Sequence, residues 1–413
     1  MFVDLSEDHS PYATFHDLTA TYRSQRGLRE LRESFTARQD MFYEYYAYPP
    51  LLMMIYYPLA KAADRLIPLD RQFAIHGPAA GIVVPPLFHL FFKPPLFVAE
   101  LGIVALLWRL AGREAARRFF LNPLVILISA MWTVDALMAL PVIWSIALLR
   151  RARYPASAVA LAAGTMIKFL PAVLLPAVLL YLWHRGVSRR TIIAYGGTFA
   201  LVCALLVAPF WTGFREVLLF QALRPGANLS IHIVLYPLAM LTRIDGRTLD
   251  YLANVVSPVI GTITLVAALT LAYAHLARRV RPLTQAMTIS LLAFILGSKV
   301  VNESYVYLLV PLMLLELHRH PGESKEIGFK VLYALPLAFA FLNVPILYAV
   351  APFYRYFWRG PFPVSYSWNR AFPVAEHAVL IPVLAAAFVA GCAYMVWTMI
   401  RENSDGKAPA AAH

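Results

Sequence analysis

GTMIKFLPAVLLP, residues 164–176, places one lysine, Lys168, inside an apolar run and a proline, Pro171, three residues later. A charged side chain at the centre of a bilayer costs about 2.5 to 3.5 kcal/mol on insertion scales, so a charge within a membrane segment is by default a functional candidate. Whether Lys168 lies in a membrane, and at which depth, depends on the segments around it.

The composition of the whole chain is that of a polytopic membrane protein. Of its 413 residues, 60% are hydrophobic and 14% are charged, and the mean hydropathy is +0.62. These values lie outside the range of a soluble domain. The 36 Lys and Arg exceed the 23 Asp and Glu, but the cations fall in short clusters between apolar segments. That pattern argues against nucleic-acid binding and is typical of cytoplasmic loops.

Basic clusters divide the chain into apolar stretches. If every cluster is cytoplasmic, each stretch between two clusters must leave the cytoplasmic side and return. The stretches 119–149 and 154–183 are each about 30 residues long. Two full crossings of the membrane, out and back, need about 40 residues. Each stretch therefore predicts two short helices joined by a bend. The clusters lie at Arg65 and Arg71 and at 109–118, 150–153, 184–190, 278–281 and 318–326.

Polar residues stand at the midpoints of these stretches. The first midpoint places Asp135 at a bend, and the second places Lys168 there, with Pro171 beginning the returning helix because proline suits a first turn. Polar backbone at membrane depth is tolerated where it is buried in protein or lines a wet cavity. We therefore expect these bends to form a functional region on the non-cytoplasmic side.

Two further stretches repeat the pattern. Residues 73–108 are expected to bend near Lys93 and Glu100, and residues 282–317 near the polar run from Lys299 to Tyr305. Four bends would thus carry scarce charges to one side. The residues of the last bend that we expect to act are Lys299, Asn302, Glu303 and Tyr305.

The expected fold is an all-α, polytopic transmembrane helical bundle with about 11–13 membrane segments, including the short hairpin pairs. Residues 1–48 are expected to form an outer, non-cytoplasmic region, and residues 49–63 to cross inward. The outer region either follows a first helix upstream of this sequence, which we favour, or lies on the surface in another way. Residues 49–400 form the transmembrane domain. Residues 401–413 are expected to be a disordered cytoplasmic tail.

Five motifs in order resemble a known superfamily. They are YAYPPL (46–51), KPPLFVAEL (93–101), NPLVILISAMWTVDAL (122–137), GTMIKFLPAVLLP (164–176) and SKVVNESYVYLLVP (298–311). Together they resemble the GT-C superfamily of integral membrane glycosyltransferases that use polyprenyl-phosphate sugars. The resemblance is strongest to the mannosyltransferase of glycosylphosphatidylinositol assembly and to mycobacterial-type lipid-glycan mannosyltransferases.

The resemblance implies a GT-C-like fold and transfer of a hexose, with mannose favoured. It also implies a catalytic base on the long first outer loop, where Asp4 is the first choice, followed by Asp8 and Asp17. The stretch GANLSIHIVL (226–235) is expected to border the active-site cavity. The chain departs from the family in having no D-x-D motif on that loop and in reading WTVD before the bend.

Sugar transfer from a lipid phosphate to a hydroxyl needs a carboxylate that accepts the proton and cations that stabilise the departing phosphate. We assign catalysis to Asp4, Asp8 and Glu100, with Glu100 orienting the base or the acceptor. Donor-phosphate and substrate contacts are assigned to Lys93, Asp135, Lys168, Lys299, Asn302, Glu303 and Tyr305. With one base, single displacement with inversion is the simplest path, since a double displacement needs a second carboxylate as nucleophile.

Each of these residues also has a structural interpretation. Asp135 and Lys168 fit a buried ion pair, and Glu100 fits a salt bridge with Lys93 or another bend lysine. Lys168 and Lys299 fit snorkelling to the interface, and the polar residues near Tyr305 fit helix caps. A membrane transporter or lipid flippase is the alternative function, since charges at broken helices also line substrate pathways. A non-catalytic assembly subunit is a third.

The expected partners are a polyprenyl-phosphate-sugar donor, a lipid or glycan acceptor and membrane lipids, but no nucleic acid. No cofactor is expected, no residue is assigned as a metal ligand, and the need for a divalent metal stays open. The expected location is integral and multi-pass, in the plasma membrane of a prokaryote or the endoplasmic reticulum of a eukaryote.

Overall fold

The computed structural model describes residues 48–66, 86–130, 133–211, 214–215, 217–218, 221, 227–230, 256–342 and 374–401. The predicted catalytic residues Asp4 and Asp8, together with Asp17, lie outside the described residues, as does the tail 402–413. Nearly all of the described chain is helical, so the predicted all-α helical bundle is confirmed.

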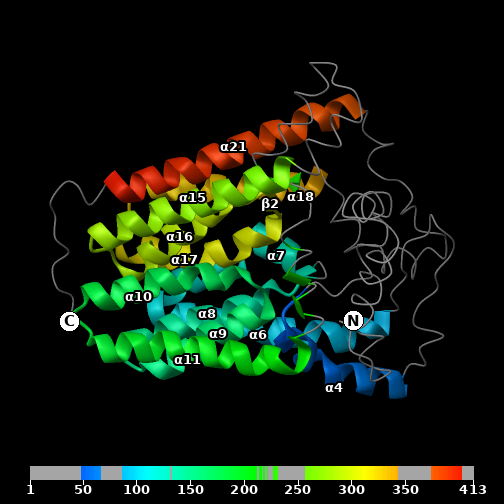
Figure 1. Ribbon diagram of the computed structural model, residues 1–413. Coiled ribbons are helices and arrows are strands. Elements are labelled where there is room, and N and C mark those ends of the chain that lie inside the picture. The colour runs from blue at the N-terminus through cyan, green and yellow to red at the C-terminus, as the bar shows by residue number, and fades with distance from the viewer. Residues whose placement is uncertain are drawn as a thin grey trace.

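The helices lie side by side along a common direction, and the chain passes back and forth between the two ends of the bundle (Figure 1). Their order in the chain is α4 (Pro50–Leu66), α6 (Pro86–Phe120), α7 (Pro123–Ala130), α8 (Asp135–Arg150), α9 (Tyr154–Ile167), η2 (Leu170–Leu174), α10 (Leu175–His184), α11 (Arg189–Val207), η3 (Ala208–Phe210), α15 (Ser257–Arg278), α16 (Leu283–Gly297), η6 (Glu303–Tyr305), α17 (Val306–Arg319), α18 (Glu323–Leu342) and α21 (Val374–Arg401). Two short strands, β1 (Ala227–Asn228) and β2 (Val300–Val301), pair in parallel.

The core of the bundle lies around α16 and α17. Every residue of α17 from Val306 to Leu317 is buried. A helix that is apolar on all sides is stable only when other helices surround it. The outer helices instead expose large apolar side chains, among them Leu205 of α11 and Leu271 of α15.

Four described helical stretches are long and apolar enough to cross a membrane: Phe91–Phe120, Arg189–Phe210, Ser257–Arg278 and Val379–Arg401. The stretches Tyr154–Ile167, Leu170–His184 and Leu283–Gly297 are shorter apolar helices. This mixture of long and short apolar helices agrees with the length argument that predicted hairpin pairs.

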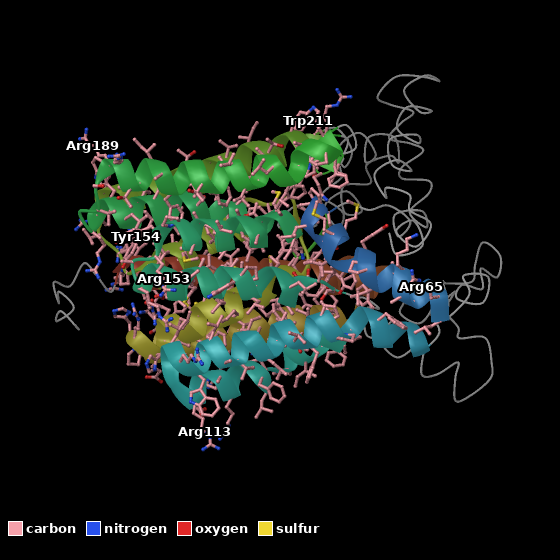
Figure 2. All side chains as sticks on the ribbon, turned by 90° about the horizontal axis from the view of Figure 1, so that it is seen from below. Arg65, Arg113, Arg153, Tyr154, Arg189 and Trp211 are labelled. Carbon is pink, nitrogen blue, oxygen red and sulfur yellow. The ribbon has the colours of Figure 1, made fainter. Side chains whose placement is uncertain are left out.

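Basic residues that are far apart in the sequence gather at one end of the bundle. Arg113, Arg153 and Arg189 lie together there (Figure 2). We call the end of the bundle that carries these three arginines the basic end, and we call the opposite end of the bundle the bend end. Since α9 starts at Tyr154, at the basic end, and stops at Ile167, the following residue, Lys168, lies at the bend end.

Three of the four predicted bends are confirmed. The first separates α7, which ends at Ala130, from α8, which begins at Asp135. The second contains Lys168 between α9 and η2, and the third runs from the end of α16 at Gly297 to the start of α17 at Val306. In Figure 1, α7 and β2, which flank two of these bends, appear at the same end.

The bend predicted near Lys93 is wrong. α6 continues through Pro94 and Pro95 and is interrupted only at Gly112, whose φ of 83° and ψ of 175° are essentially restricted to glycine. A proline fixes φ near the helical value and removes one donor, and a bundle can satisfy the freed carbonyl. The glycine in the basic cluster therefore reverses the chain, and the proline pair does not.

The predicted inward crossing by residues 49–63 is also wrong. Arg65, near the end of α4, lies at the bend end, away from Arg113 and Arg153 (Figure 2). The Tyr56 ring of α4 stacks on Phe92 of α6 with 4.9 Å between centroids, and its hydroxyl donates a 3.0 Å hydrogen bond to the Phe92 carbonyl. These contacts fix α4 beside the first turns of α6. The positive-inside rule counts charges statistically, so a single cluster such as Arg65 does not determine a crossing.

Candidate functional site

Lys168 leaves the helical path just where α9 ends. Its φ of −151° and ψ of 137° are extended, while its N–H still donates to the Gly164 carbonyl at 3.1 Å. Pro171, in the first turn of η2, lacks the N–H that would donate to the Ile167 carbonyl and continue the α-helical ladder. The chain therefore stops being regular at Lys168.

The Lys168 ammonium joins two other bends. Its Nζ lies 2.6 Å from Asp135 Oδ1 and donates a 3.1 Å hydrogen bond to Ser304 Oγ. The same Nζ lies 5.0 Å from the centroid of the Tyr305 ring, within the range of a cation–π contact. Asp135 is 1% exposed and Lys168 is 12% exposed, so the pair is largely shielded from solvent.

Asp135 is placed by the start of α8, where it is the first helical residue. A carboxylate there faces the positive end of the helix dipole. Glu303 in η6 is buried too, and its carboxylate interacts electrostatically with Lys168 and Asp135. The ion pair proposed for Asp135 and Lys168 is thus present, with a second carboxylate beside it.

A second polar group connects α6, α7 and α17. The Ser129 hydroxyl donates to Glu100 Oε1, and the Tyr307 hydroxyl donates to the same oxygen at 3.5 Å. Lys93 Nζ donates to the carbonyls of Ser129 and Ala130 at 2.8 and 3.0 Å. Glu100 is thus held by hydroxyls, and Lys93 satisfies carbonyls at the end of α7.

The two polar groups are neighbours. Tyr307 interacts electrostatically with Asp135 as well as with Glu100. Ala130, which accepts a bond from Lys93, precedes Asp135 by only five positions. Lys93 and Glu100 therefore reach the predicted region although the bend expected around them does not form.

Lys299 and Asn302 belong to the third bend, but their recorded contacts differ from those of Lys168 and Asp135. Lys299 is 9% exposed, and its aliphatic chain packs so closely on α15 that a Cβ added at Gly261 would lie 2.4 Å from Lys299 Cβ. The Asn302 carbonyl accepts a 3.0 Å bond from the Tyr305 N–H, so this residue begins η6. Among the described residues, no hydrogen bond or ion pair joins Lys299 to Lys168 or Asp135.

The strand pair brings one more segment to this bend. Asn228 pairs with Val301, and the Leu229 N–H donates to the Val301 carbonyl at 2.9 Å. The Ser230 hydroxyl that follows is buried and has no hydrogen-bond partner among the described residues. The first residues of the stretch 226–235 therefore lie against the third bend.

Sequence reasoning missed three residues of the site: Ser129, Ser304 and Tyr307. Ser304 and Tyr307 stand in the same short run as Glu303 and Tyr305, which was singled out for its charge. A hydroxyl in an apolar helix gives little signal by itself, since it can also bond its own backbone. Only the partners, Lys168 and Glu100, reveal the role of these hydroxyls.

Taken together, the predicted residues supply balanced charge at the bend end: the lysines Lys93, Lys168 and Lys299, and the carboxylates Glu100, Asp135 and Glu303. Such a mixture can bind an anionic group through the lysines and accept a proton through a carboxylate. Within the described part of the chain, no three His, Cys, Asp or Glu side chains gather in a way that could hold a metal ion.

No known protein-family model matches this chain, and no curated protein is significantly similar to it in sequence.

Proposed function

We propose that this chain is an integral membrane glycosyltransferase that moves a hexose from a polyprenyl phosphate to a hydroxyl of a lipid or glycan acceptor. The proposal places the basic end in the cytoplasm, following the positive-inside rule, and the bend end on the non-cytoplasmic face. The chain would be a multi-pass protein of the plasma membrane or the endoplasmic reticulum. By the resemblance of the five motifs, the fold is of the GT-C type and the sugar is mannose.

One observation carries the proposal: the Lys168 ammonium meets Asp135 and Ser304, so that three separate bends converge at the end of the bundle opposite the arginines. Buried ionised groups are costly, and a fold that only needed stability could replace the pair by apolar side chains. A cation held where three bends meet at the headgroup level suits the phosphate of a lipid that stays in the membrane.

On the donor side, Lys168 is the proposed phosphate contact. Asp135 keeps the ammonium charged and directed, and Ser304 offers a hydroxyl beside it. As the bond between the sugar C1 and the phosphate oxygen breaks, its electron pair stays on that oxygen. Cations placed in advance at the departing oxygen stabilise this charge without reorganising.

On the acceptor side, Glu100 is the proposed carboxylate among the described residues. Both hydroxyl donors that the described residues provide bind Oε1, so within this part of the chain Oε2 is available to take the proton of the acceptor hydroxyl. As that proton moves, the acceptor oxygen forms its bond to C1 from the face opposite the phosphate, and the configuration inverts. Asp4 and Asp8 remain the alternative bases, as the resemblance implies.

Transfer is favoured over transport by the chemistry of the bend end, where a proton acceptor and a phosphate-binding cation lie together. A flippase moves its lipid unchanged, so it needs no carboxylate with a free oxygen beside the lipid phosphate. Vesicles that contain the protein and the labelled donor separate the two functions. Transfer yields a new labelled product, whereas transport yields only the donor on the other leaflet.

The test uses the purified full-length chain with radiolabelled polyprenyl-phosphate-mannose and a lipid extract as the source of acceptors. Products are separated by thin-layer chromatography. Lys168→Ala should lower product formation by about 10²- to 10³-fold, the range for loss of one group that stabilises transition-state charge.

Lys330→Ala is the matched control, since Lys330 is exposed on α18, and it should leave product formation unchanged. Equal activity of the Lys168 and Lys330 variants would remove Lys168 from the mechanism. If the wild type forms no product from polyprenyl-phosphate-mannose or -glucose but moves the donor across the vesicle, the transporter alternative replaces the transferase.

A further inference from the structure

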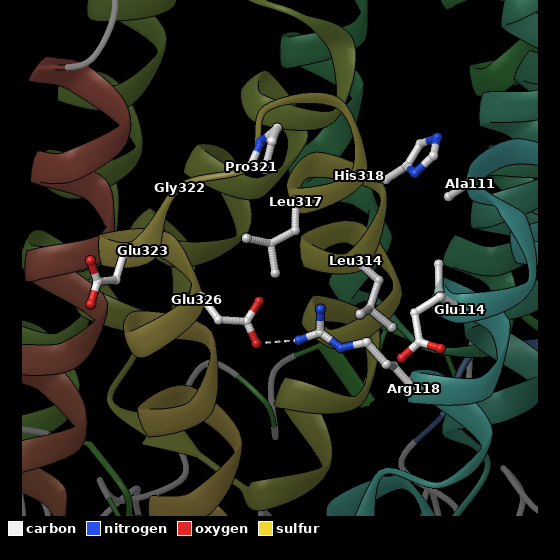
Figure 3. A pocket seen from close by; sticks show the side chains of 11 residues that line it. Ala111, Glu114, Arg118, Leu314, Leu317, His318, Pro321, Gly322, Glu323 and Glu326 are labelled. Carbon is white, nitrogen blue, oxygen red and sulfur yellow. Dashed lines mark hydrogen bonds and ion pairs between the residues drawn. The ribbon is translucent and has the colours of Figure 1, made fainter.

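A pocket of about 300 Å³ lies far from the bends. It opens between the second half of α6 and the start of α18, above α17, and its wall includes the loop residues Pro321 and Gly322 (Figure 3). Arg113, which belongs to the same part of α6, marks the basic end in Figure 2. The pocket is therefore separate from the Lys168 site.

The floor of this pocket is apolar. Ala111, Ala115, Leu314 and Leu317 line it, and all four side chains are buried. The two alanines, one on each side of the interruption at Gly112, leave room that larger side chains would fill. Ligand pockets typically combine such an apolar lining with a few convergent polar groups.

Four charged side chains line the pocket beside this floor: Glu114, Arg118, Glu323 and Glu326. Arg118 Nη2 lies 2.5 Å from Glu326 Oε1, and the two side chains are 31% and 32% exposed. The Glu114 side chain stands one turn before Arg118 on α6 and lies beside it in the pocket (Figure 3). Glu114 makes no hydrogen bond or ion pair with any residue that the structure describes.

The charge of these groups defines the ligand. Three carboxylates against one guanidinium leave two negative charges in a chain whose formal net charge is +13. Because Arg118 is already paired with Glu326, the carboxylate of Glu114 is available for a cation. The apolar floor, in turn, favours a cation that is attached to an apolar body.

We propose that this pocket binds the ammonium group of an aminophospholipid, whose head group joins a primary amine to a phosphate. The ammonium would lie between Glu114 and Glu326, and the glycerol and first chain carbons would lie on the alanines and leucines. Arg113 and Arg117, both exposed on the same segment of α6, would face the lipid phosphate. The inference rests on the membrane placement of the bundle and is independent of the transferase chemistry.

The test measures lipid bound to the full-length protein in detergent by native mass spectrometry, after addition of phosphatidylethanolamine, phosphatidylcholine or phosphatidylglycerol. We expect phosphatidylethanolamine to bind best, since the trimethylated amine of phosphatidylcholine donates no hydrogen bond. Glu114→Gln should weaken phosphatidylethanolamine binding about fivefold, the factor expected for loss of one partly exposed charge contact.

Glu323→Gln is the control, because this glutamate also lines the pocket but its carboxylate is directed away from Arg118 (Figure 3). It should bind phosphatidylethanolamine like the wild type. Equal binding of the ethanolamine and choline lipids, or equal loss in the two glutamine variants, would overturn the proposal.

Free phosphoethanolamine separates a lipid from a soluble ligand. If it displaces the lipid at the same concentration, the apolar floor contributes nothing and the lipid assignment is wrong. Retention of phosphatidylglycerol by Glu114→Gln shows that this variant is folded. A failure of this test leaves the transferase proposal intact, because mannose transfer is measured at the other end of the bundle.

Discussion

Lys168 Nζ donates a hydrogen bond to Ser304 Oγ across 136 positions of sequence, at 3.1 Å. The bond ties the bend after α9 to the bend before α17. Because Asp135 holds the same ammonium from a third bend, the position of Lys168 is fixed from two sides. This arrangement leads to predictions for stability as well as for activity.

Removing Asp135 alone should destabilise the protein more than removing the whole pair. Asp135→Leu leaves the Lys168 charge without its closest partner, and loss of one member of a buried pair typically costs about 3 to 5 kcal/mol. The double variant Asp135→Leu with Lys168→Met should cost clearly less than the two single changes added together. Denaturant titration in detergent measures the free energy of unfolding, and strict additivity would show that the two groups are not coupled.

Glu100→Gln should lower product formation strongly while the protein stays folded. A positioned carboxylate that takes a proton typically contributes about 10²- to 10⁴-fold. Ser129→Ala should cause a smaller loss, since it removes one of the two hydroxyl donors to Oε1 of Glu100 but keeps the carboxylate. Steady-state assays with labelled donor give both values, with Glu323→Gln as the reference. Full activity of Glu100→Gln would transfer the role of base to the outer-loop aspartates.

Gly297→Ala should weaken the contact between α15 and α16. A Cβ at this position would lie 2.6 Å from Leu265 Cα and 2.8 Å from the Thr264 carbonyl oxygen. These are backbone atoms that cannot rotate away, so overpacking by about 1 to 3 kcal/mol is expected. The measurement is the free energy of unfolding.

Gly196→Ala is the matched control for that change. Gly196 lies inside α11, and an added Cβ would meet no atom within 4 Å. Alanine should stabilise the helix there by about 0.5 to 1 kcal/mol. Similar effects of the two substitutions would contradict the tight packing at Gly297.

A second buried ion pair should prove important for folding rather than for chemistry. Lys325 Nζ lies 3.2 Å from Glu316 Oε1, and Thr284 Oγ1 donates to Glu316 Oε2 at 2.8 Å. Lys325→Met should destabilise the bundle by about 3 kcal/mol, because it removes the lysine from a buried carboxylate whose other partners are Thr284 and His320, with His320 Nδ1 3.3 Å from Oε1. Lys330→Met, on the exposed face of the same helix, should change the free energy of unfolding by less than about 0.5 kcal/mol. A similar loss of unfolding free energy in both variants would show that any substitution on α18 has this effect, and that the ion pair with Glu316 does not cause it.

The sequence by itself determined where the chain must bend. The lengths of the apolar stretches between arginine clusters, together with Pro171, located the bends at Asp135, at Lys168 and before Val306, because these are local properties of spacing and backbone. The same spacing argument failed at Lys93 and Arg65, since it assumed that every basic cluster, including the one at Arg65, lies at the same end of the bundle.

Tertiary structure alone decided which side chains meet. That Lys168 binds Ser304, and that Ser129 and Tyr307 share one oxygen of Glu100, depends on how each helix is rotated and how far it is shifted along its neighbours. Rotation and shift follow from packing all the helices against one another, so one segment read alone does not contain them. The continuation of α6 through Pro94 and Pro95 likewise became clear only from the structure, since a proline can be tolerated inside a membrane helix when neighbouring groups satisfy the backbone.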